Sequence, residues 1–205
     1  MIEPQFQLGD VEVAEKETTY QGFFRMARLK LRHKLFGGGW SGWMTRELFE
    51  RGDAVAAILY DPQHDLVGFV EQFRVGALKQ PYGPWCLEVV AGMTEPGETP
   101  EQVMAREIEE ESGLQAARLI PICNYLSSPG GTDEQLHLFC AICSLQGAGG
   151  VFGLAAENED IRLHVAPAGE VFANLYQGRF NNAATLLCLQ WLQIHHAELR
   201  SGSSL

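Results

Sequence analysis

Residues 92–114 decide the fold of this chain, and their sequence is GMTEPGETPEQVMAREIEEESGL. Seven specific residues and two apolar ones stand at fixed offsets in this stretch: Gly92, Glu98, Arg106, Glu107, Ile108, Glu110, Glu111, Gly113 and Leu114. With each fixed residue at about 6% usage, a chance match is on the order of one in a billion per starting position. The spacing alone therefore indicates a specific sequence motif and not a chance match.

The acidic residues of this stretch predict a cation site on a helix. If residues 100–112 are helical, Glu107 and Glu111 lie one turn apart and Glu110 lies beside them, whereas Glu109 faces away. Like charges at this spacing repel each other and destabilise a helix. A hard divalent cation with oxygen ligands removes the repulsion. The alternative is a solvated acidic face, the usual fate of a glutamate run.

The residues around this segment predict where the helix begins and ends. Thr99 suits the N-cap, and Pro100 suits the first helical position. Gly113 suits the end of the helix, where a left-handed residue is common.

The spacing matches the Nudix box, G-x5-E-x7-R-E-U-x-E-E-x-G-U with U apolar, without a departure. The chain therefore resembles the Nudix hydrolases, which cleave a nucleoside diphosphate linked to another group. The resemblance implies an α/β class fold, the Nudix α/β/α sandwich with a mixed β-sheet. The order of strand and helix patterns along the chain favours the same architecture.

The composition is that of an ordinary globular protein. The chain has 205 residues, of which 46% are hydrophobic and 20% charged. No apolar run reaches the ~18 residues of a membrane span, and the polar, acidic first residues are wrong for a signal peptide. Five cysteines, an odd number, indicate reduced thiols. We expect a cytoplasmic protein without a membrane partner.

The net charge of −11 disfavours nonspecific nucleic-acid binding, which depends on neutralising phosphates with Lys and Arg. Residues 25–34 nevertheless carry five of the fifteen basic residues, and the pattern from Arg28 to Lys34 alternates as in a strand. One interpretation of this basic stretch is a surface that binds nucleic acid. A half-exposed hairpin strand or a surface that meets an acidic neighbour is favoured over it.

Cys140 and Cys143 form a C-x-x-C pair inside an apolar, alternating stretch. In a strand, residues three apart face opposite sides of the sheet, so we expect no shared metal ligation and no redox role.

Alternating and apolar patterns predict further elements on both sides of the box. A turn at Gly37–Gly39 is expected to return the basic strand through residues 43–50. The other expected strands are residues 53–60, 66–73, 85–91, 116–126, 135–145 and 161–166, and helices are expected at 168–177 and 182–199. We expect an N-terminal β-strand extension over residues 1–50, a Nudix domain over 51–200 and a frayed tail over 201–205.

Motifs outside the box resemble one group within the family, the bacterial ADP-ribose pyrophosphatases. Pro129 lies sixteen residues after Gly113, as in that group. The resemblance covers residues 10–199 and includes these segments: Tyr20-x-Gly22-Phe23-Phe24, Arg46-Glu47-x-Phe49-Glu50-Arg51-Gly52, Glu71-Gln72-x-Arg74, Glu88-x-Val90-Ala91-Gly92 and Glu157-Asn158-Glu159-Asp160-Ile161. It implies hydrolysis of ADP-ribose to AMP and ribose 5-phosphate.

The resemblance also implies roles for individual residues. Glu107, Glu111 and the carbonyl oxygen of Ala91 would hold Mg²⁺, for which Mn²⁺ can substitute, with Glu110 close to the ions. Glu98 and Arg106 would form an ion pair that, with Gly113, shapes the box. Arg74 would bind the diphosphate. The remaining substrate-binding residues would be Phe23 and Arg46 on either side of the adenine, together with Glu47, Gly92, Met93, Ser128 and Glu134.

The catalytic base would lie outside the box, because the box glutamates are occupied by metal. The loop 153–160 offers three carboxylates. The family pattern points to Glu157, with Glu159 second and an acidic exposed loop as the structural alternative. The resemblance further implies a homodimer whose N-terminal strands are swapped, which places Phe23 and Arg46 across the interface.

Two alternatives to this function remain open. One is a Nudix hydrolase that prefers another ADP-sugar, such as ADP-glucose or ADP-mannose. The other is a sensor that binds ADP-ribose without cleaving it. Such sensors usually lose box glutamates, and none is missing here.

Overall fold

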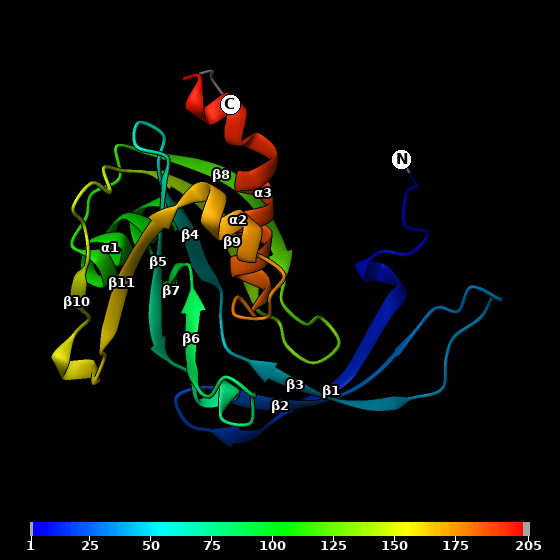
Figure 1. The fold of residues 1–205 in the computed structure, drawn as a ribbon. Helices are drawn as coiled ribbons and strands as arrows, with labels where there is room; N and C mark the ends of the chain where they lie inside the picture. Colours follow the sequence, from blue (N-terminus) through cyan, green and yellow to red (C-terminus); the bar gives the residue numbers. More distant parts are fainter. Residues whose placement is uncertain (1, 203–205) are drawn as a thin grey trace. The chain divides into compact units, whose positions relative to one another are not determined.

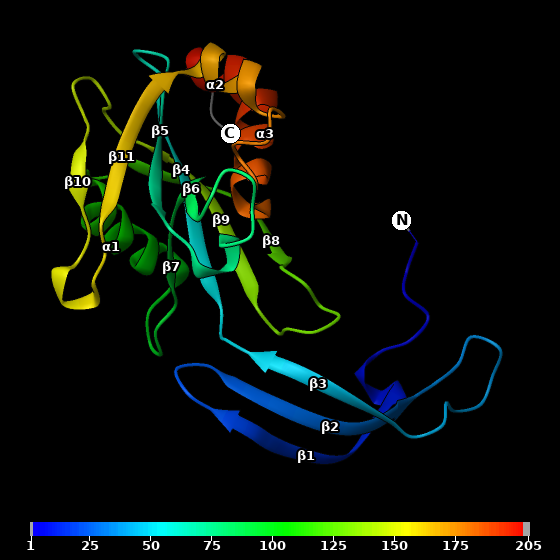
Figure 2. The ribbon, with the colours of Figure 1, turned by 60° about the horizontal axis from the view of Figure 1, so that its bottom comes forward.

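The computed structural model describes residues 2–202, and the chain divides into two compact units. One unit comprises Met1–Gly52 with Leu126–Glu134, and the other comprises Asp53–Tyr125 with Gln135–Leu205. The expected frayed tail falls largely on residues 203–205, which lie outside the described part of the chain. Figures 1 and 2 show the elements of both units from two directions.

The first unit is built on a three-stranded antiparallel sheet in the order β1–β2–β3. Its elements are the 3-10 helix η1 (Leu8–Asp10) and the strands β1 (Val11–Gln21), β2 (Arg25–His33) and β3 (Met44–Glu50). The basic strand and its return after the glycine turn are thus confirmed, since β2 pairs with β3 from Arg25 to Leu31.

Acidic side chains of β1 face the basic side chains of β2. Three ion pairs join the two strands: Arg28 to Glu17 at 2.6 Å, Lys30 to Glu15 at 3.3 Å and Arg32 to Glu12 at 2.6 Å. The favoured interpretation of the basic stretch, a surface that meets an acidic neighbour, is therefore what the structure contains. Exposed pairs of this kind contribute little stability each, about 0–1 kcal/mol.

The second unit contains an eight-stranded mixed sheet. Its central path runs β10–β11–β5–β4–β9–β8, with β6 beside β5 and β7 beside β4. β4 pairs parallel with β9 and antiparallel with β5 and β7. The strands are β4 (Ala54–Asp61), β5 (Leu66–Phe73), β6 (Trp85–Glu88), β7 (Val90–Met93), β8 (Arg118–Leu126), β9 (Gln135–Ile142), β10 (Gly150–Phe152) and β11 (Ile161–Pro167).

Helices cover both faces of this sheet, as expected for an α/β/α sandwich. α1 (Pro100–Ser112) packs on one face through Val103, Met104 and Ile108. α2 (Ala168–Asn174) and α3 (Ala183–Arg200) pack on the other face. Figure 2 shows α1 apart from the α2–α3 pair. All eight residues of β4 are buried between these layers, which explains why its sequence is almost continuously apolar.

The two cysteines of the C-x-x-C pair lie on opposite faces of the sheet. Cys140 is buried in the core beneath α2 and α3, and Cys143 is buried in the core beneath α1. The expectation that these two cysteines face opposite sides of the sheet is confirmed. Within residues 2–202, no helix combines the length and apolar character needed to cross a membrane.

One expected strand, residues 85–91, is in fact two. β6 pairs with β5, and β7 crosses to pair with β4, so the ladder is broken at Val89. The N–H of Val89 donates instead to the Thr185 hydroxyl at 3.1 Å, and both residues are buried. The sequence pattern also missed β10 and the 3-10 helices η2 (Val75–Ala77) and η3 (Ala155–Glu157), each of three residues.

Replacing Thr185 with Val tests whether the Thr185 hydroxyl anchors the Val89 N–H. The variant keeps the shape of the side chain but leaves the Val89 N–H without its acceptor. We expect the free energy of unfolding to fall by about 1–3 kcal/mol. Hydrogen exchange of the Val89 amide should accelerate, and Thr185→Ser, which retains the hydroxyl, should keep that amide protected. Unchanged exchange in Thr185→Val would contradict the anchor.

Candidate active site

The box helix begins and ends where its sequence predicts. The Thr99 hydroxyl accepts from the Gln102 N–H, and the Gln102 side chain accepts from the Thr99 N–H at 2.9 Å. Gly113 ends the helix with φ +67°, a left-handed conformation that glycine adopts without a steric cost. The ends of α1 are thus fixed by local chemistry, and this fixes which side chains the helix presents.

Gly92 lets β7 approach the box helix closely. A Cβ atom built at this position would lie 2.0 Å from Cδ of Glu107, closer than any real contact. The glycine at the start of the box is therefore required by sterics, because any side chain there would displace the first glutamate of the R-E-U-x-E-E run.

Glu111 is a buried carboxylate on the inner side of α1, with 3% of the residue exposed. Its Oε2 accepts from the Ala91 N–H at 3.2 Å, so the helix is bonded to β7 beside Gly92. Ala91 therefore brings its backbone to the same place as the two glutamates. These are the three groups expected to hold the metal.

The two glutamates share an environment that disfavours their charges. Burial raises the pKa of the Glu107 carboxyl to about 7, against the opposing charge of Arg106 and with a contribution from the Glu110 carboxylate. Burial likewise raises the pKa of the Glu111 carboxyl to about 8, partly offset by the Ala91 N–H and increased by the charge of Glu107. The Glu159 carboxylate also raises both values.

This donor set fits a hard divalent cation. Carboxylate and carbonyl oxygens are the ligands that Mg²⁺ takes from proteins, and it keeps several waters besides. A cation would add positive charge beside the buried pair, where Arg106 alone does not offset burial. Within residues 2–202, no three Asp, Glu, His or Cys side chains converge on one point. Two carboxylates and a backbone carbonyl would leave the remaining positions of such a cation to water.

Arg106 organises the exposed side of the box. Its Nη1 donates to Glu107 at 2.9 Å and to Glu110 at 3.1 Å, and its Nη2 lies 3.7 Å from Glu98. The ion pair expected between Glu98 and Arg106 is present, but the shorter contacts go to the two neighbouring glutamates. Glu109 is exposed, as expected for a residue on the far side of the helix.

A polar chain behind Arg74 was not foreseen from the sequence. Nε of Arg74 donates to Glu88 Oε2 at 2.7 Å, and the other oxygen of Glu88 accepts from the Asn182 side chain at 2.8 Å. The bond fixes the guanidinium through Nε, which leaves both Nη groups for a ligand. Glu88 is a lone carboxylate in an apolar strand. Such a residue indicates a charged partner, because buried charges are paired.

The loop 153–160 carries the two candidate bases, Glu157 and Glu159, and the surroundings of the two carboxylates differ. Glu157 ends η3 and is exposed. Glu159 is half-buried, and its Oε2 accepts from the Leu154 N–H at 3.2 Å. The Glu159 carboxylate is one of the charges that raise the pKa values of Glu107 and Glu111. The structure thus distinguishes two carboxylates that the sequence ranked by resemblance alone.

The remaining expected substrate residues are in the first unit, except for Met93, which follows Gly92 in β7. Phe23 is 87% exposed at the bend between β1 and β2, so it does not serve the core of this chain. Arg46 and Glu47 are exposed on β3, where Arg46 Nη1 donates to the Thr45 carbonyl at 2.9 Å. An exposed ring and an exposed guanidinium are available for a ligand or a second chain.

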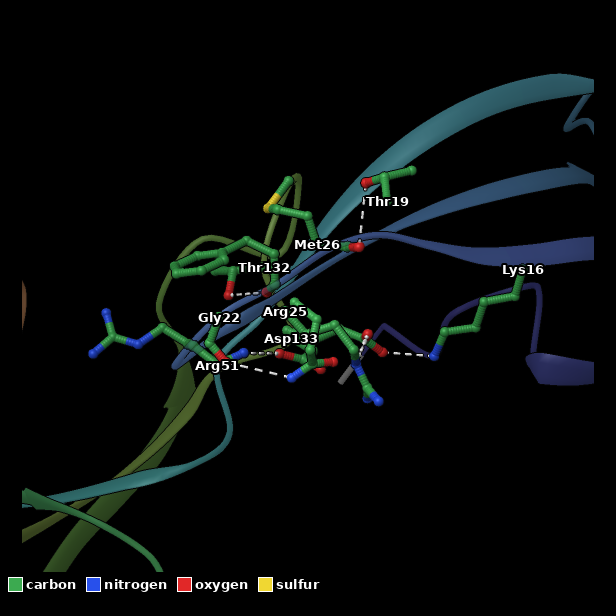
Figure 3. A network of polar contacts seen from close by, with 11 residues as sticks. Lys16, Thr19, Gly22, Arg25, Met26, Arg51, Thr132 and Asp133 are labelled. Atoms are coloured by element: carbon green, nitrogen blue, oxygen red, sulfur yellow. Dashed lines mark hydrogen bonds and ion pairs between the residues drawn. The ribbon is translucent and has the colours of Figure 1, made fainter.

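The Pro-Gly-Gly loop is bonded to the end of β3. Phe49 N–H donates to the Gly131 carbonyl at 2.8 Å, and Figure 3 shows the backbone of Arg51 beside Asp133 and Thr132. In this loop Ser128 is exposed, and its carbonyl oxygen closes the turn. Glu134 is buried and paired with Arg51 at 3.0 Å, a contact that by itself stabilises the loop.

The close approach of β7 to α1 predicts the effect of Gly92→Ala. The new methyl group would push the Glu107 carboxylate away from Ala91 and Glu111. We expect the affinity for Mg²⁺ or Mn²⁺, measured by titration calorimetry, to fall by at least about tenfold, while the circular dichroism spectrum stays native. Gly169→Ala is the control, because a Cβ there meets nothing within 4 Å. Equal affinities in the two variants would contradict the steric argument.

Comparison with known proteins agrees with this geometry. The family model described as the NUDIX domain matches residues 50–182. The chain is 44% identical over 200 residues to "ADP-ribose pyrophosphatase" of Haemophilus influenzae, covering 96% of this chain and 92% of the relative. It is 43% identical over 196 residues to "ADP-ribose pyrophosphatase" of Escherichia coli K12, covering 96% and 94%.

Two further similarities are more distant. "GDP-mannose pyrophosphatase" of Cronobacter sakazakii is 32% identical over 154 residues, covering 73% of this chain and 78% of the relative. The solved structure "Crystal structure of ADP compounds hydrolase" has a TM-score of 0.72 at 18% identity, covering 96% of this chain and all of that one, which shows the same fold. With its box geometry, its domain match and these identities, the chain belongs to the Nudix family.

Proposed function

We propose that this protein is an Mg²⁺-dependent ADP-ribose pyrophosphatase, which hydrolyses ADP-ribose to AMP and ribose 5-phosphate. The observation that carries the proposal is the buried pair of Glu107 and Glu111 against the backbone of Ala91, within a complete box. The relatives that match 96% of the chain at 43–44% identity bear the name of this activity.

The reaction adds water across the diphosphate. The water oxygen forms a bond to one phosphorus, the bridging P–O bond breaks, and the leaving phosphate takes the bond's electron pair. Glu107, Glu111 and the Ala91 carbonyl would hold the cation, with Glu110 beside it. A bound divalent cation supplies charge neutralisation at the phosphates and acidifies water. Mn²⁺ offers the same oxygen preference and would substitute for Mg²⁺.

The side chains of this protein supply the rest. The free Nη groups of Arg74 can form a fork to phosphate oxygens, and the Glu88 bond holds that fork in place. Phe23 and Arg46 would enclose the adenine, with Glu47, Met93, Ser128 and Glu134 as further contacts. The carboxylate that takes the proton from water would be Glu157, with Glu159 as the second candidate.

Two alternatives differ from this proposal in substrate or in chemistry. Another ADP-sugar would share the ADP half and differ only at the terminal sugar. A non-catalytic ADP-ribose sensor would need no intact metal site, and the buried carboxylate pair argues against it. Incubation with Mg²⁺ and a panel of ADP-ribose, ADP-glucose, ADP-mannose and GDP-mannose, followed by product analysis, separates these functions. AMP and ribose 5-phosphate as the preferred products support the proposal, whereas no hydrolysis of any substrate overturns it.

Glu111→Gln should abolish most of the activity. The substitution keeps the shape of the side chain but removes a charge that holds the cation and, through it, the diphosphate. We expect kcat to fall by several orders of magnitude, on the scale of other metal-assisted reactions. The measurement is ADP-ribose hydrolysis across a range of Mg²⁺ concentrations. Near-normal turnover at saturating Mg²⁺ would remove Glu111 from the site.

Glu157→Gln tests the base. We expect kcat to fall by roughly 10²–10⁴, the usual contribution of a general base. KM should change little, because binding depends on the arginines, the aromatic ring and the metal. Glu159→Gln is the matched variant. A large loss confined to Glu159→Gln would transfer the role to Glu159, and small losses in both variants would end the idea of a base on this loop.

The protein should be a homodimer in which the first unit contributes Phe23 and Arg46 to the partner's site. The exposure of Phe23 motivates this, because a ring that is 87% exposed is available for contact with a second chain. An exchange of this kind gives a two-fold symmetric contact. Sedimentation at micromolar concentration should report a dimer, and a fully active monomer would refute the arrangement.

A further inference from the structure

The loop that carries Glu157 is attached to the box helix at its first end by an aromatic ring. A Cβ on Gly113 would lie 2.7 Å from Cε1 of Phe152, and a Cβ on Gly150 would lie 3.2 Å from Cε2 of the same ring. Phe152 therefore packs against two glycine backbones. It also packs against the core cluster that contains Ile108 of α1. Gly113, the second glycine of the box, thus leaves room for the Phe152 ring, which lies just before the loop.

A hydrogen bond continues this attachment. The Gly153 N–H donates to the Glu110 carbonyl at 3.3 Å. The last four carbonyls of an α-helix have no partner within the helix, and the Glu109 carbonyl already accepts from Gly113. The loop therefore satisfies a carbonyl at the end of α1 that the helix itself leaves open.

The second end of the loop is joined back to the first by Glu159. Its carboxylate accepts from the Leu154 N–H at 3.2 Å, and its own N–H donates to the Leu154 carbonyl at 3.3 Å. Gly153, with φ +102°, lies so close that a Cβ on it would be 2.8 Å from Cβ of Glu159. The side chain and the backbone of Glu159 thus both bond to Leu154, and these bonds close the loop between the two residues.

Glu157 lies at the exposed turn of this closed loop. It ends η3, and Asn158 follows it with φ +57°. In the described part of the chain, the Glu157 carboxylate has no hydrogen bond or ion pair that would hold it. The Glu157 N–H donates to the Leu154 carbonyl at 2.9 Å, so the position of Glu157 is set by the backbone of the loop and not by contacts of its carboxylate.

We propose that Phe152 and Glu159 are positioning residues, which hold the loop carrying Glu157 on the C-terminal end of the box helix. This inference rests on the proposed function, because it assigns the proton transfer to Glu157. It gives Glu159 a part in the reaction that does not require it to touch substrate. It also gives Phe152, a residue outside every motif, a part in the same reaction.

Glu159 can be tested by comparing a conservative and a truncating variant. In Glu159→Gln the amide oxygen can still accept from the Leu154 N–H, whereas Glu159→Ala removes the acceptor. We expect Glu159→Gln to keep kcat within about tenfold and Glu159→Ala to lose on the order of 10²-fold, as displaced catalytic groups do. Equal, large losses in both variants would make Glu159 the base and overturn the proposal.

Phe152 is tested by Phe152→Ala, with Phe152→Leu as the variant that keeps bulk. Val151→Ala is the matched control, because Val151 is an exposed neighbour in the same strand. We expect kcat to fall ten- to a hundredfold in Phe152→Ala. KM and the affinity for Mg²⁺ should stay within about threefold, and Phe152→Leu should recover most of kcat. Hydrogen exchange should accelerate in residues 153–160 and stay unchanged in α1.

Hydrogen exchange of the loop distinguishes a failed positioning role from a failed choice of base. Unchanged exchange of the loop in Phe152→Ala, or a loss of Mg²⁺ affinity as large as the loss of kcat, would overturn the positioning role. A normal kcat in Glu157→Gln would instead overturn the choice of base, whatever the exchange of the loop shows.

Discussion

The close approach of a strand backbone to two glutamates is the constraint on which the rest of the site depends. β7 can lie against α1 only because position 92 has no side chain, and the Ala91 N–H then reaches the buried Glu111. The arrangement carries a cost of its own, since two carboxylates are brought together out of water. The packing of Val103, Met104 and Ile108 into the core offsets this cost and holds the helix in place. Core packing thus maintains an electrostatically unfavourable cluster that a cation can relieve.

The helix was predictable to the residue because its determinants are local. Thr99, Pro100 and Gly113 each act within one turn of their own position, so the sequence alone contains what fixes the ends of α1. The buried strands β4 and β5 were predictable for the same reason, as apolar runs of strand length. The break at Val89 was not, because its cause is the hydroxyl of Thr185, nearly a hundred residues later in the chain.

The site was predictable in its carboxylates and less so in their partners. The spacing of the box indicated which glutamates converge, but Arg106 contacts Glu107 and Glu110 more closely than its expected partner Glu98. The support of Arg74 by Glu88 and Asn182 depends on three separate elements, so no local pattern contains it. Residues that bind a ligand recur in motifs, whereas residues that hold them in place depend on tertiary packing. The role of Phe152 belongs to this second kind.

The parallel pairing of β4 with β9 has a consequence for how the chain matures. β4 is buried along its whole length, yet its parallel neighbour, which begins its pairing at Leu136, is made only after the box helix is complete. During synthesis, the edge of β4 that pairs with β9 would lack its partner for several seconds at the usual rate of about 5–20 residues per second. Such a strand is a site for aggregation. Yield in the cell is therefore expected to depend on chaperone capacity and elongation rate as well as on the stability of the finished protein.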